Sequence, residues 1–355
     1  MIEPTATRME QLKKVAEARF GGKTAKILIT QLDPDAMGAG MGMLHWLDRA
    51  LNIKSQIFFC GGMDHPQNRS IYSLFSLGRV MKPASEFTDE DFGDVILVDS
   101  SSNRDVRVSG KKFNPAIVID HHEGDISQEI PGTFHWVEPV GAASTLVGEL
   151  LMESGLLDRR DDMDAEMVAT MLAIGIATDT HDFRERAERR RDREVWDTLM
   201  DYASAENYGA LLNYDLPPRY YELLNQITDP KNSKIIQGSV MIARAGLVSK
   251  NETAFLAEFA DLLLRKKEVQ TVLVWAPVDG VGFAIKMRTV DSSESLVDRL
   301  QELFSSGGAK SAQGISSGGT TVRLENFLTP CKGNEETAIS FFSECLDIRL
   351  KDAFK

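Results

Sequence analysis

The most informative segment of this chain reads PAIVIDHH and covers residues 115–122. Its first five residues are all apolar, which is typical of a strand buried on both faces of a sheet. The strand ends in one carboxylate and two imidazoles, those of Asp120, His121 and His122. Similar apolar runs occupy 26–30, 55–59 and 94–99. Segments with helical periodicity lie between and after these runs, at 36–51, 68–77, 142–154 and 164–177. This alternation predicts an α/β fold with a parallel sheet and helices on both faces.

The pattern of expected strands and helices changes after Pro217-Pro218. Expected strands at 235–246, 270–276 and 281–288 share this part of the chain with expected helices at 252–266, 294–305 and 335–350. A chain of 355 residues is also longer than one hydrophobic core usually organises. We therefore predict a first domain at 1–215, a linker at 216–235 and a smaller α/β domain at 236–355.

Charge and composition restrict the partners. The net charge of −13 disfavours a long nucleic-acid duplex, because such partners are held by releasing counterions to Lys and Arg. Short phosphorylated substrates remain compatible with it. The three cysteines form no CxxC pair, and no segment has the length and apolar character of a membrane span. We expect a cytoplasmic protein that does not bind membranes and that could form a homodimer.

Acidic and imidazole side chains recur at the ends of the predicted strands. In an open α/β sheet, ligands bind outside the carboxyl ends of the strands. Asp33 and Asp35 follow the first strand, Asp99 ends the third, and Asp179 ends an apolar helix. Taken singly, such an Asp is usually a turn former or a helix cap, and for Asp35 capping alone is the alternative explanation. Together these carboxylates would repel one another unless a divalent cation lies between them.

The chemistry of this set favours Mn²⁺ or Mg²⁺ and does not favour zinc. Oxygen donors with one imidazole suit the former ions, and thiolates are lacking. The Asp33–Asp35 pair can direct one carboxylate to each of two ions, and Asp99 can bridge them. Two such ions would hold a phosphoryl group and activate water. We therefore expect a phosphoesterase.

The same segments resemble the DHH phosphoesterase superfamily, beginning with VIDHHEGD at 118–125. Four other segments agree with its motifs in order and spacing: LDPDAMGAGMGML (32–44), VILVDSSSNRD (95–105), WVEPVGAASTLVGELL (136–151) and IGIATDTHDFR (174–184). Together they cover most of residues 26–190.

The resemblance implies roles for individual residues. Two Mn²⁺ (or Mg²⁺) ions per chain would be held by five ligands: Asp33, Asp35, Asp99, His121 and Asp179. His122 would face the substrate phosphate, and Asp120 would orient the histidines, so that His122, Asp99 and Asp120 form the catalytic set. The family often has a further histidine four residues before the first Asp. This chain has Ile29 there, so one metal would bind more weakly, or Gln31 or water would replace the missing ligand.

The C-terminal block resembles the DHH-associated domain of the branch that contains nano-RNases and phosphoadenosine-phosphate phosphatases. FAIKMRTVDSS (283–293) makes Arg288 a candidate for binding a substrate phosphate or base, and Arg184 is a second candidate. GGAKSAQG (307–314) matches a glycine-rich loop and implies substrate contacts by Gly307, Gly308 and Lys310. Ala309 stands where the family has a histidine. The alternative is that this segment is only a flexible surface loop.

We therefore expect a two-metal phosphoesterase with its metal site in the cleft between the domains. It would hydrolyse short oligoribonucleotides or 3′-phosphoadenosine 5′-phosphate by attack of metal-bound hydroxide. A pyrophosphatase or exopolyphosphatase, and a cyclic-dinucleotide phosphodiesterase, are the alternatives within the same class. A nucleotide-binding regulatory protein that has lost catalysis is the alternative outside it, motivated by Ile29 and Ala309.

Overall fold

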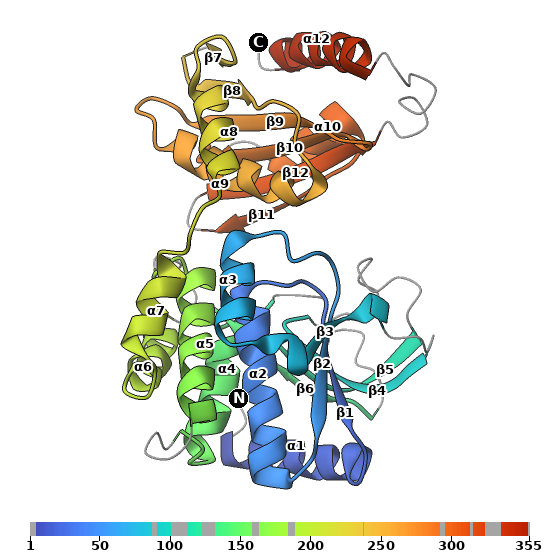
Figure 1. Cartoon of the computed structure of the whole chain (residues 1–355), viewed down its shortest axis with the longest axis vertical. Helices are drawn as coiled ribbons and strands as arrows, with labels where there is room; N and C mark the ends of the chain where they lie inside the picture. The colour runs from blue at the N-terminus through green and yellow to red at the C-terminus, as the bar shows by residue number, and fades with distance from the viewer. Residues whose placement is uncertain are drawn as a thin grey trace. The chain divides into compact units, whose positions relative to one another are not determined.

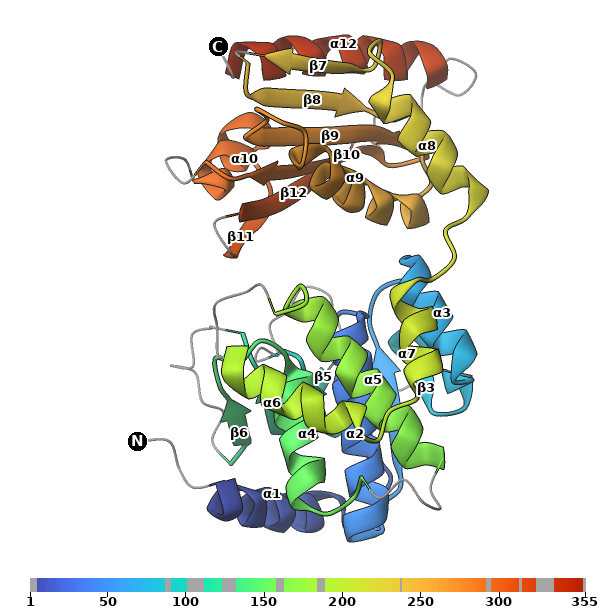
Figure 2. The ribbon, with the colours of Figure 1, turned by 90° about the vertical axis from the view of Figure 1, so that its left-hand side faces the viewer.

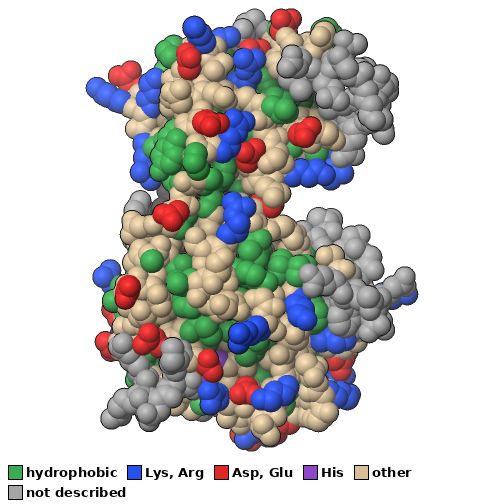
Figure 3. Space-filling model, viewed as in Figure 1, with side chains coloured by type: hydrophobic (Ala, Val, Ile, Leu, Met, Phe, Trp, Pro, Cys, Tyr) green, Lys and Arg blue, Asp and Glu red, His purple; other side chains and the backbone are tan. Residues whose placement is uncertain are grey.

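The computed structural model separates into two compact units, Met1–Asp215 and Leu216–Lys355 (Figures 1 and 2). It describes residues 5–86, 91–100, 112–122, 132–157, 163–183, 189–236, 238–291, 295–312, 315–323 and 335–353. No helix in these ranges is both long enough and apolar enough to cross a bilayer. On the face drawn in Figure 3, acidic and basic side chains are interspersed.

Unit 1 is built on a six-stranded sheet in the order β3-β2-β1-β4-β5-β6, and every pairing within it is parallel. The strands are β1 (Ala25–Ile29), β2 (Ser55–Phe59), β3 (Met81–Pro83), β4 (Asp91–Val98), β5 (Lys112–Asp120) and β6 (Phe134–Val137). The predicted parallel α/β sheet is confirmed. The strand order reverses between β1 and β4, and such a switch point is where ligands bind in this kind of sheet.

The helices of unit 1 share one large apolar core with one face of the sheet. They are α1 (Thr5–Phe20), α2 (Pro34–Leu51), α3 (Pro66–Leu74), α4 (Ala143–Glu153), α5 (Met163–Asp179), α6 (Arg189–Met200) and α7 (Ala205–Leu212). The other face of the sheet buries a smaller cluster that includes Leu28, Phe58 and Leu97. Ala84, in the short 3-10 helix η2 (Ala84–Glu86), also belongs to this smaller cluster.

Helices α2 and α5 approach each other closely because glycines lie at their contact. A Cβ atom at Gly38 would lie 2.6 Å from the carbonyl oxygen of Met171. A Cβ atom at Gly175 would lie 2.9 Å from the Cα atom of Asp35. Both neighbours are backbone atoms of buried helices and cannot move aside cheaply. The glycines therefore set the distance between the start of α2 and the end of α5.

Unit 2 contains a mixed sheet in the order β11-β12-β10-β9-β8-β7, in which only β8 and β9 pair in parallel. Its strands are β7 (Ser233–Ile236), β8 (Val240–Arg244), β9 (Thr271–Val278), β10 (Gly282–Thr289), β11 (Gly308–Ala312) and β12 (Ile315–Arg323). Residues of α8 (Pro218–Thr228) and α9 (Phe255–Leu264) form one core with this sheet. Residues of α10 (Leu296–Phe304) and α12 (Glu335–Ala353) form another.

Two sequence-based predictions are corrected in unit 2. The segment 216–235 is no linker, because it contains α8 and most of β7, and Leu223 and Ile227 are fully buried in the core. The expected loop at 307–314 lies largely in β11, which pairs with β12 at the edge of the sheet. Small and polar residues form these strands: β12 pairs with β10, and β11 pairs with β12 in turn. A Cβ at Gly319 would lie 2.6 Å from the carbonyl oxygen of Ile285 in β10, so this glycine permits close strand packing.

We expect Gly38→Ala to destabilise unit 1. Overpacking against a rigid backbone costs about 1–3 kcal/mol, whereas the gain in helix propensity is at most about 1 kcal/mol. The net loss should lower the melting temperature by several degrees, which calorimetry can measure. Gly209→Ala in α7 is the matched control, because a Cβ there meets nothing within 4 Å. The control should melt at the same temperature or higher. Equal melting of both variants would contradict the tight α2–α5 contact.

Candidate metal centre

The imidazole of His121 lies among three carboxylates. Its Nε2 atom is 3.2 Å from Asp179 Oδ2, 3.4 Å from Asp99 Oδ1 and 3.7 Å from Asp35 Oδ2. These acids come from the end of α5, the residue after β4 and the first turn of α2. The structure thus brings together four of the five residues predicted as metal ligands, at the switch point of the sheet.

Asp99 is held in a left-handed backbone conformation, with φ of 55°. This conformation costs about 1–2 kcal/mol for a residue other than glycine. The Asp99 N–H donates to the carbonyl of Ile119 at 2.9 Å, which ties the residue to β5. Its Oδ1 atom is buried and has no hydrogen-bond partner among the described residues. A strained residue with an unsatisfied carboxylate oxygen indicates a functional site.

Asp35 receives the first N–H groups of α4. Its Oδ2 accepts from Ala143 N at 2.7 Å, and its Oδ1 accepts from Ser144 N at 2.7 Å. The N-cap residue of helix α4 is Ala142, whose side chain cannot accept a hydrogen bond, so Asp35 supplies the cap from another helix. Asp35 is only 1% exposed. Its carboxylate therefore has a structural role and also lies beside His121.

Asp120 holds both histidines of the motif. Its Oδ1 accepts from the backbone N–H groups of His121 at 2.8 Å and His122 at 3.3 Å. The same oxygen lies 2.8 Å from His122 Nδ1. His121 is held from its other side, where Nδ1 lies 3.2 Å from the carbonyl oxygen of Val140 and donates to it. This leaves His121 Nε2 directed at the acids, while the His122 side chain is 52% exposed.

Asp33 caps its own helix. Its backbone is extended, and its Oδ1 accepts from Ala36 N at 2.9 Å at the start of α2. Its Oδ2 accepts from Gln31 Nε2 at 3.3 Å. The charge of Asp33 also raises the pKa of Asp99, which places its carboxylate near the cluster. The capping role that the sequence allows for Asp35 is therefore performed for α2 by Asp33.

Ile29 offers no ligand to this cluster. It is the last residue of β1 and is fully buried in the apolar core of unit 1. The extra histidine that the family often has at this place is thus replaced by core packing. The donor set at the switch point consists of carboxylates and the two adjacent imidazoles.

Burial and mutual repulsion shift the pKa values of the cluster. Burial raises the pKa of Asp35, and the charge of Asp179 adds to this effect. Burial likewise raises the pKa of Asp99 well above its usual value. Burial alone would lower the pKa of His121, but the close carboxylates of Asp179, Asp99 and Asp35 outweigh it and raise the pKa to about 12. The site therefore retains a positive charge even without metal, in the form of a proton.

This arrangement fits a divalent cation. Asp35, His121 and Asp179 form one group of donors that could hold a metal ion, and Asp99, Asp120, His121 and His122 form another. Asp99 Oδ1, Asp120 Oδ2 and His121 Nε2 are buried and have no hydrogen-bond partner in the described part of the chain. Unsatisfied donor atoms of this kind are what a bound cation would satisfy.

Asp192 is part of the support for this centre, and the sequence analysis missed it. It lies in α6, is 1% exposed and accepts from Gly141 N at 3.0 Å and Thr145 Oγ1 at 2.7 Å. It thereby fixes the segment from Val140 to Thr145, which contacts both His121 and Asp35. Asp192 lies in an arginine-rich segment, 183–193, of a composition that is typical of a solvated surface. The helical spacing of apolar residues could have indicated that Asp192 is buried, because it lies on the same helix face as the buried Val195 and Leu199.

The predicted substrate residues are not part of this cluster in the described structure of unit 1. Arg184 lies outside the described residues. Arg288 lies on β10 of unit 2, where its Nε is 2.5 Å from Asp261 Oδ1 of α9. Gly307 has φ of 127°, which requires glycine, and a Cβ at Gly308 would meet nothing within 4 Å. Lys310 of β11 lies opposite Ser317 of β12 in the sheet, and Ser317 lies opposite Arg288 of β10.

Comparison with known proteins places the metal cluster in a family. Residues 26–176 match the family described as DHH family, N-terminal domain. Over this range, a little over two fifths of the chain, the protein is similar to the N-terminal domain of that family. The matched range contains Asp33, Asp35, Asp99, His121 and His122, and it stops three residues before Asp179.

Relatives of the DHH domain include proteins named "probable manganese-dependent inorganic pyrophosphatase". The one from Thermotoga maritima is 32% identical over 113 residues, which is 32% of this chain and 19% of that protein. The match therefore spans about a fifth of that relative's length. The one from Streptococcus suis is 24% identical over 255 residues, covering 69% of this chain and 75% of the relative.

The fold also has a solved counterpart. An exopolyphosphatase-related protein from Bacteroides fragilis aligns with a TM-score of 0.63, covering 96% of this chain and 98% of that one. The sequence identity is 14%. At this identity the likeness concerns the fold alone.

We expect stabilisation by Mn²⁺ to increase with pH. The raised pKa values of His121, Asp35 and Asp99 mean that the metal-free folded protein binds protons that the unfolded chain releases. The stability that protonated His121 contributes is complete below its ordinary pKa of 6.5 and is lost as the pH rises towards about 12. The carboxyl groups act in the same direction above their ordinary pKa of 3.8. Mn²⁺ must displace these protons, so its affinity rises with pH.

Thermal melting with Mn²⁺ and with a chelator, at about pH 6 and about pH 8, measures this effect. The rise in melting temperature should be larger at the higher pH. His121→Gln should lose most of the rise at both pH values. A rise that is equal at both pH values, or larger at the lower one, would contradict the proposed competition between metal and protons.

We expect Asp192→Asn to weaken Mn²⁺ binding, because an NH2 group, which donates and cannot accept, replaces one of the two carboxylate oxygens that lie 3.0 Å from Gly141 N. Changes to residues that orient metal ligands typically reduce affinity by about 10–100-fold. The affinity is measured by titrating the protein with Mn²⁺ and following the electron paramagnetic resonance signal of the free ion. Asp197→Asn, which removes an exposed acid from the same helix, is the control and should bind as the wild type does. Unchanged affinity in Asp192→Asn would remove this residue from the support of the centre.

Proposed function

We propose that this chain is a manganese-dependent hydrolase of phosphoric anhydrides, with inorganic pyrophosphate as its main substrate. The observation that carries the proposal is the cluster of buried carboxylates around His121, in which three buried ligand atoms have no hydrogen-bond partner of good geometry among the described residues. The choice of substrate is supported by the relative from Streptococcus suis, with which alignment extends over 69% of this chain and so beyond the DHH domain.

Mn²⁺ at this cluster would supply Lewis-acid stabilisation of the charge on phosphoryl oxygens. Asp35, Asp99, His121 and Asp179 would hold the ions. His121 is already oriented for this role, because its Nδ1–H is donated to Val140 and its Nε2 faces the acids. Asp35 is likewise fixed by two N–H groups of α4, so that little reorganisation is needed when a cation binds.

His122 would act on the substrate itself. Its Nδ1 lies against Asp120, which fixes the ring and favours a proton on Nδ1. The other ring nitrogen is then available to a phosphoryl oxygen. Of the groups in the cluster it is the most exposed, which suits contact with a substrate that arrives from solvent. Asp120 is fully buried and acts through the two histidines.

A second candidate is hydrolysis of phosphate esters in small nucleotides, as in the nano-RNase and phosphoadenosine-phosphate phosphatase branch. One observation in unit 2 favours it. The charge of Arg288 is largely balanced by Asp261, and Gly308 and Gly319 lie side by side on the neighbouring strands. A base could lie on such a glycine-rich strand pair, whereas a small, highly charged pyrophosphate would need more unbalanced cations.

A substrate panel with Mn²⁺ separates the two candidates. Phosphate release is measured from inorganic pyrophosphate and from 3′-phosphoadenosine 5′-phosphate, and mononucleotide release from a diribonucleotide. We expect kcat/KM for pyrophosphate to exceed the other values by at least about tenfold. The reverse order would establish the nucleotide candidate in its place.

Asp99→Asn tests the centre itself. It should lower kcat on the best substrate by at least about a hundredfold, because a buried carboxylate that would hold a metal ion is replaced by a neutral amide. Asp197→Asn is the matched control and should keep wild-type activity. If wild type releases nothing from any substrate while binding Mn²⁺, the protein is the non-catalytic alternative.

A further inference from the structure

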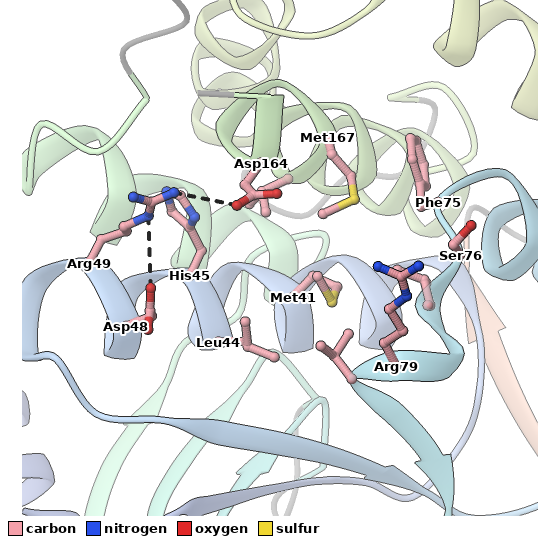
Figure 4. Close-up of a pocket in the computed structure, with 13 residues that line it drawn as sticks. Met41, Leu44, His45, Asp48, Arg49, Phe75, Ser76, Arg79, Asp164 and Met167 are labelled. Carbon is pink, nitrogen blue, oxygen red and sulfur yellow. Dashed lines mark hydrogen bonds and ion pairs between the residues drawn. The ribbon is translucent and has the colours of Figure 1, made fainter. Parts of the chain in front are cut away.

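Unit 1 has a second cavity that the metal centre does not use. It has a volume of about 260 Å³ and lies between the second half of α2, the first turns of α5 and the segment 75–80 (Figure 4). Its α2 residues run from Met41 to Arg49. They lie about 9–21 Å along the helix axis from Asp35, by the rise per residue of an α-helix. The segment 75–80 includes the 3-10 helix η1 (Leu77–Arg79).

The cavity has an apolar lining. Met41 and Leu44 contribute from α2, Met167 and Val168 from α5, and Phe75 from the segment after α3. Leu44, Phe75 and Met167 are only partly buried, so apolar surface remains in contact with solvent there. Covering such surface with an apolar group is favourable.

The rim of the cavity carries two aspartates and two arginines, and these four charges differ in how they are paired. Arg49 is shared between Asp48, at 3.9 Å, and Asp164, at 3.4 Å. Asp48 is also paired with Lys54 at 2.5 Å. The two acids are therefore already neutralised by these cations.

Arg79 is the remaining charge of the rim. It is exposed, and the described residues offer it neither a hydrogen bond nor an ion pair. In Figure 4 it extends along the cavity from the end opposite Arg49. The lining contains two arginines and two aspartates, and Arg79 is the one whose charge the described residues leave unpaired, so that it is available to an anion.

His45 adds a fixed polar group to the wall. It is 5% exposed, and its Nε2 lies 3.2 Å from the carbonyl oxygen of Leu156 and must donate to it. The ring is thus held in place by the chain between α4 and α5. A rigid wall of this kind is typical of preformed ligand pockets, which combine apolar lining with a few oriented polar groups.

We propose that this cavity binds a small organic anion, composed of one acidic group and an apolar body about the size of an aromatic ring. The acidic group pairs with Arg79, and the apolar body lies on Met41, Met167 and Phe75. The volume of about 260 Å³ lies just below the range for drug-sized ligand sites, roughly 300–1,000 Å³, and excludes a dinucleotide. The site is independent of the function proposed for the metal centre.

Methionine methyl groups provide a direct test, because Met41 and Met167 line the cavity and Met241 lies in unit 2. The full chain, labelled with ¹³C at the methionine methyls, is titrated with benzoate and with its neutral counterpart benzamide. We expect benzoate to shift the signals of Met41 and Met167 saturably and to leave Met241 unchanged. Benzamide should bind more weakly.

Arg79→Gln and Lys14→Gln form the matched pair of variants. Both remove one exposed positive charge, but Lys14 lies on α1 and pairs with Glu10. The Kd for benzoate should rise roughly three- to tenfold in Arg79→Gln and stay unchanged in Lys14→Gln. Absence of a saturable shift at Met41 and Met167 would overturn the site. Equal binding of benzamide, or an unchanged Kd in Arg79→Gln, would overturn the assignment of an anion.

Discussion

The contact on which the centre of unit 1 depends is the one between the Asp35 carboxylate and the first N–H groups of α4. Each oxygen of Asp35 accepts one of these N–H groups at 2.7 Å. This contact joins α2 to α4, and the segment just before α4 contains the carbonyl of Val140 that orients His121. The same carboxylate is buried beside the imidazole, so that one interaction serves both the packing of the helices and the metal centre.

Buried negative charge then dictates the rest of the centre. Asp35, Asp99 and Asp179 meet because the parallel strands and the glycine-mediated α2–α5 contact bring their elements to one point. Asp179 also ends α5, where the helix dipole is unfavourable for an acid. Such a group is stable only with a positive charge in its midst, and a proton on His121 or a divalent cation can provide it. The fold thus places buried negative charges together, and a bound metal ion would compensate them.

Much of this could be predicted from the sequence, because strand ends and apolar runs are local signals. Asp99 and the Asp120-His121-His122 run each follow an apolar strand, and parallel strands must meet at their carboxyl ends. Asp192 could not be assigned in this way, since its partners Gly141 and Thr145 are some fifty residues away in the chain. The strands β11 and β12 were missed because their sequence is poor in strand-forming residues, and they form by pairing, β12 with β10 and β11 with β12.

Asp35 both caps α4 and lies beside His121, and these two roles place different constraints on how its sequence position can change in evolution. A descendant that no longer needed its chemistry would be free to lose Asp99, which caps no helix in the described part of the chain. It would still be under selection to keep Asp35, because the start of α4 would otherwise lack its acceptor. Retention of Asp35 is therefore a record of the shared architecture. The presence of Asp99, held in its strained conformation, is the better marker of a lineage in which the metal still matters.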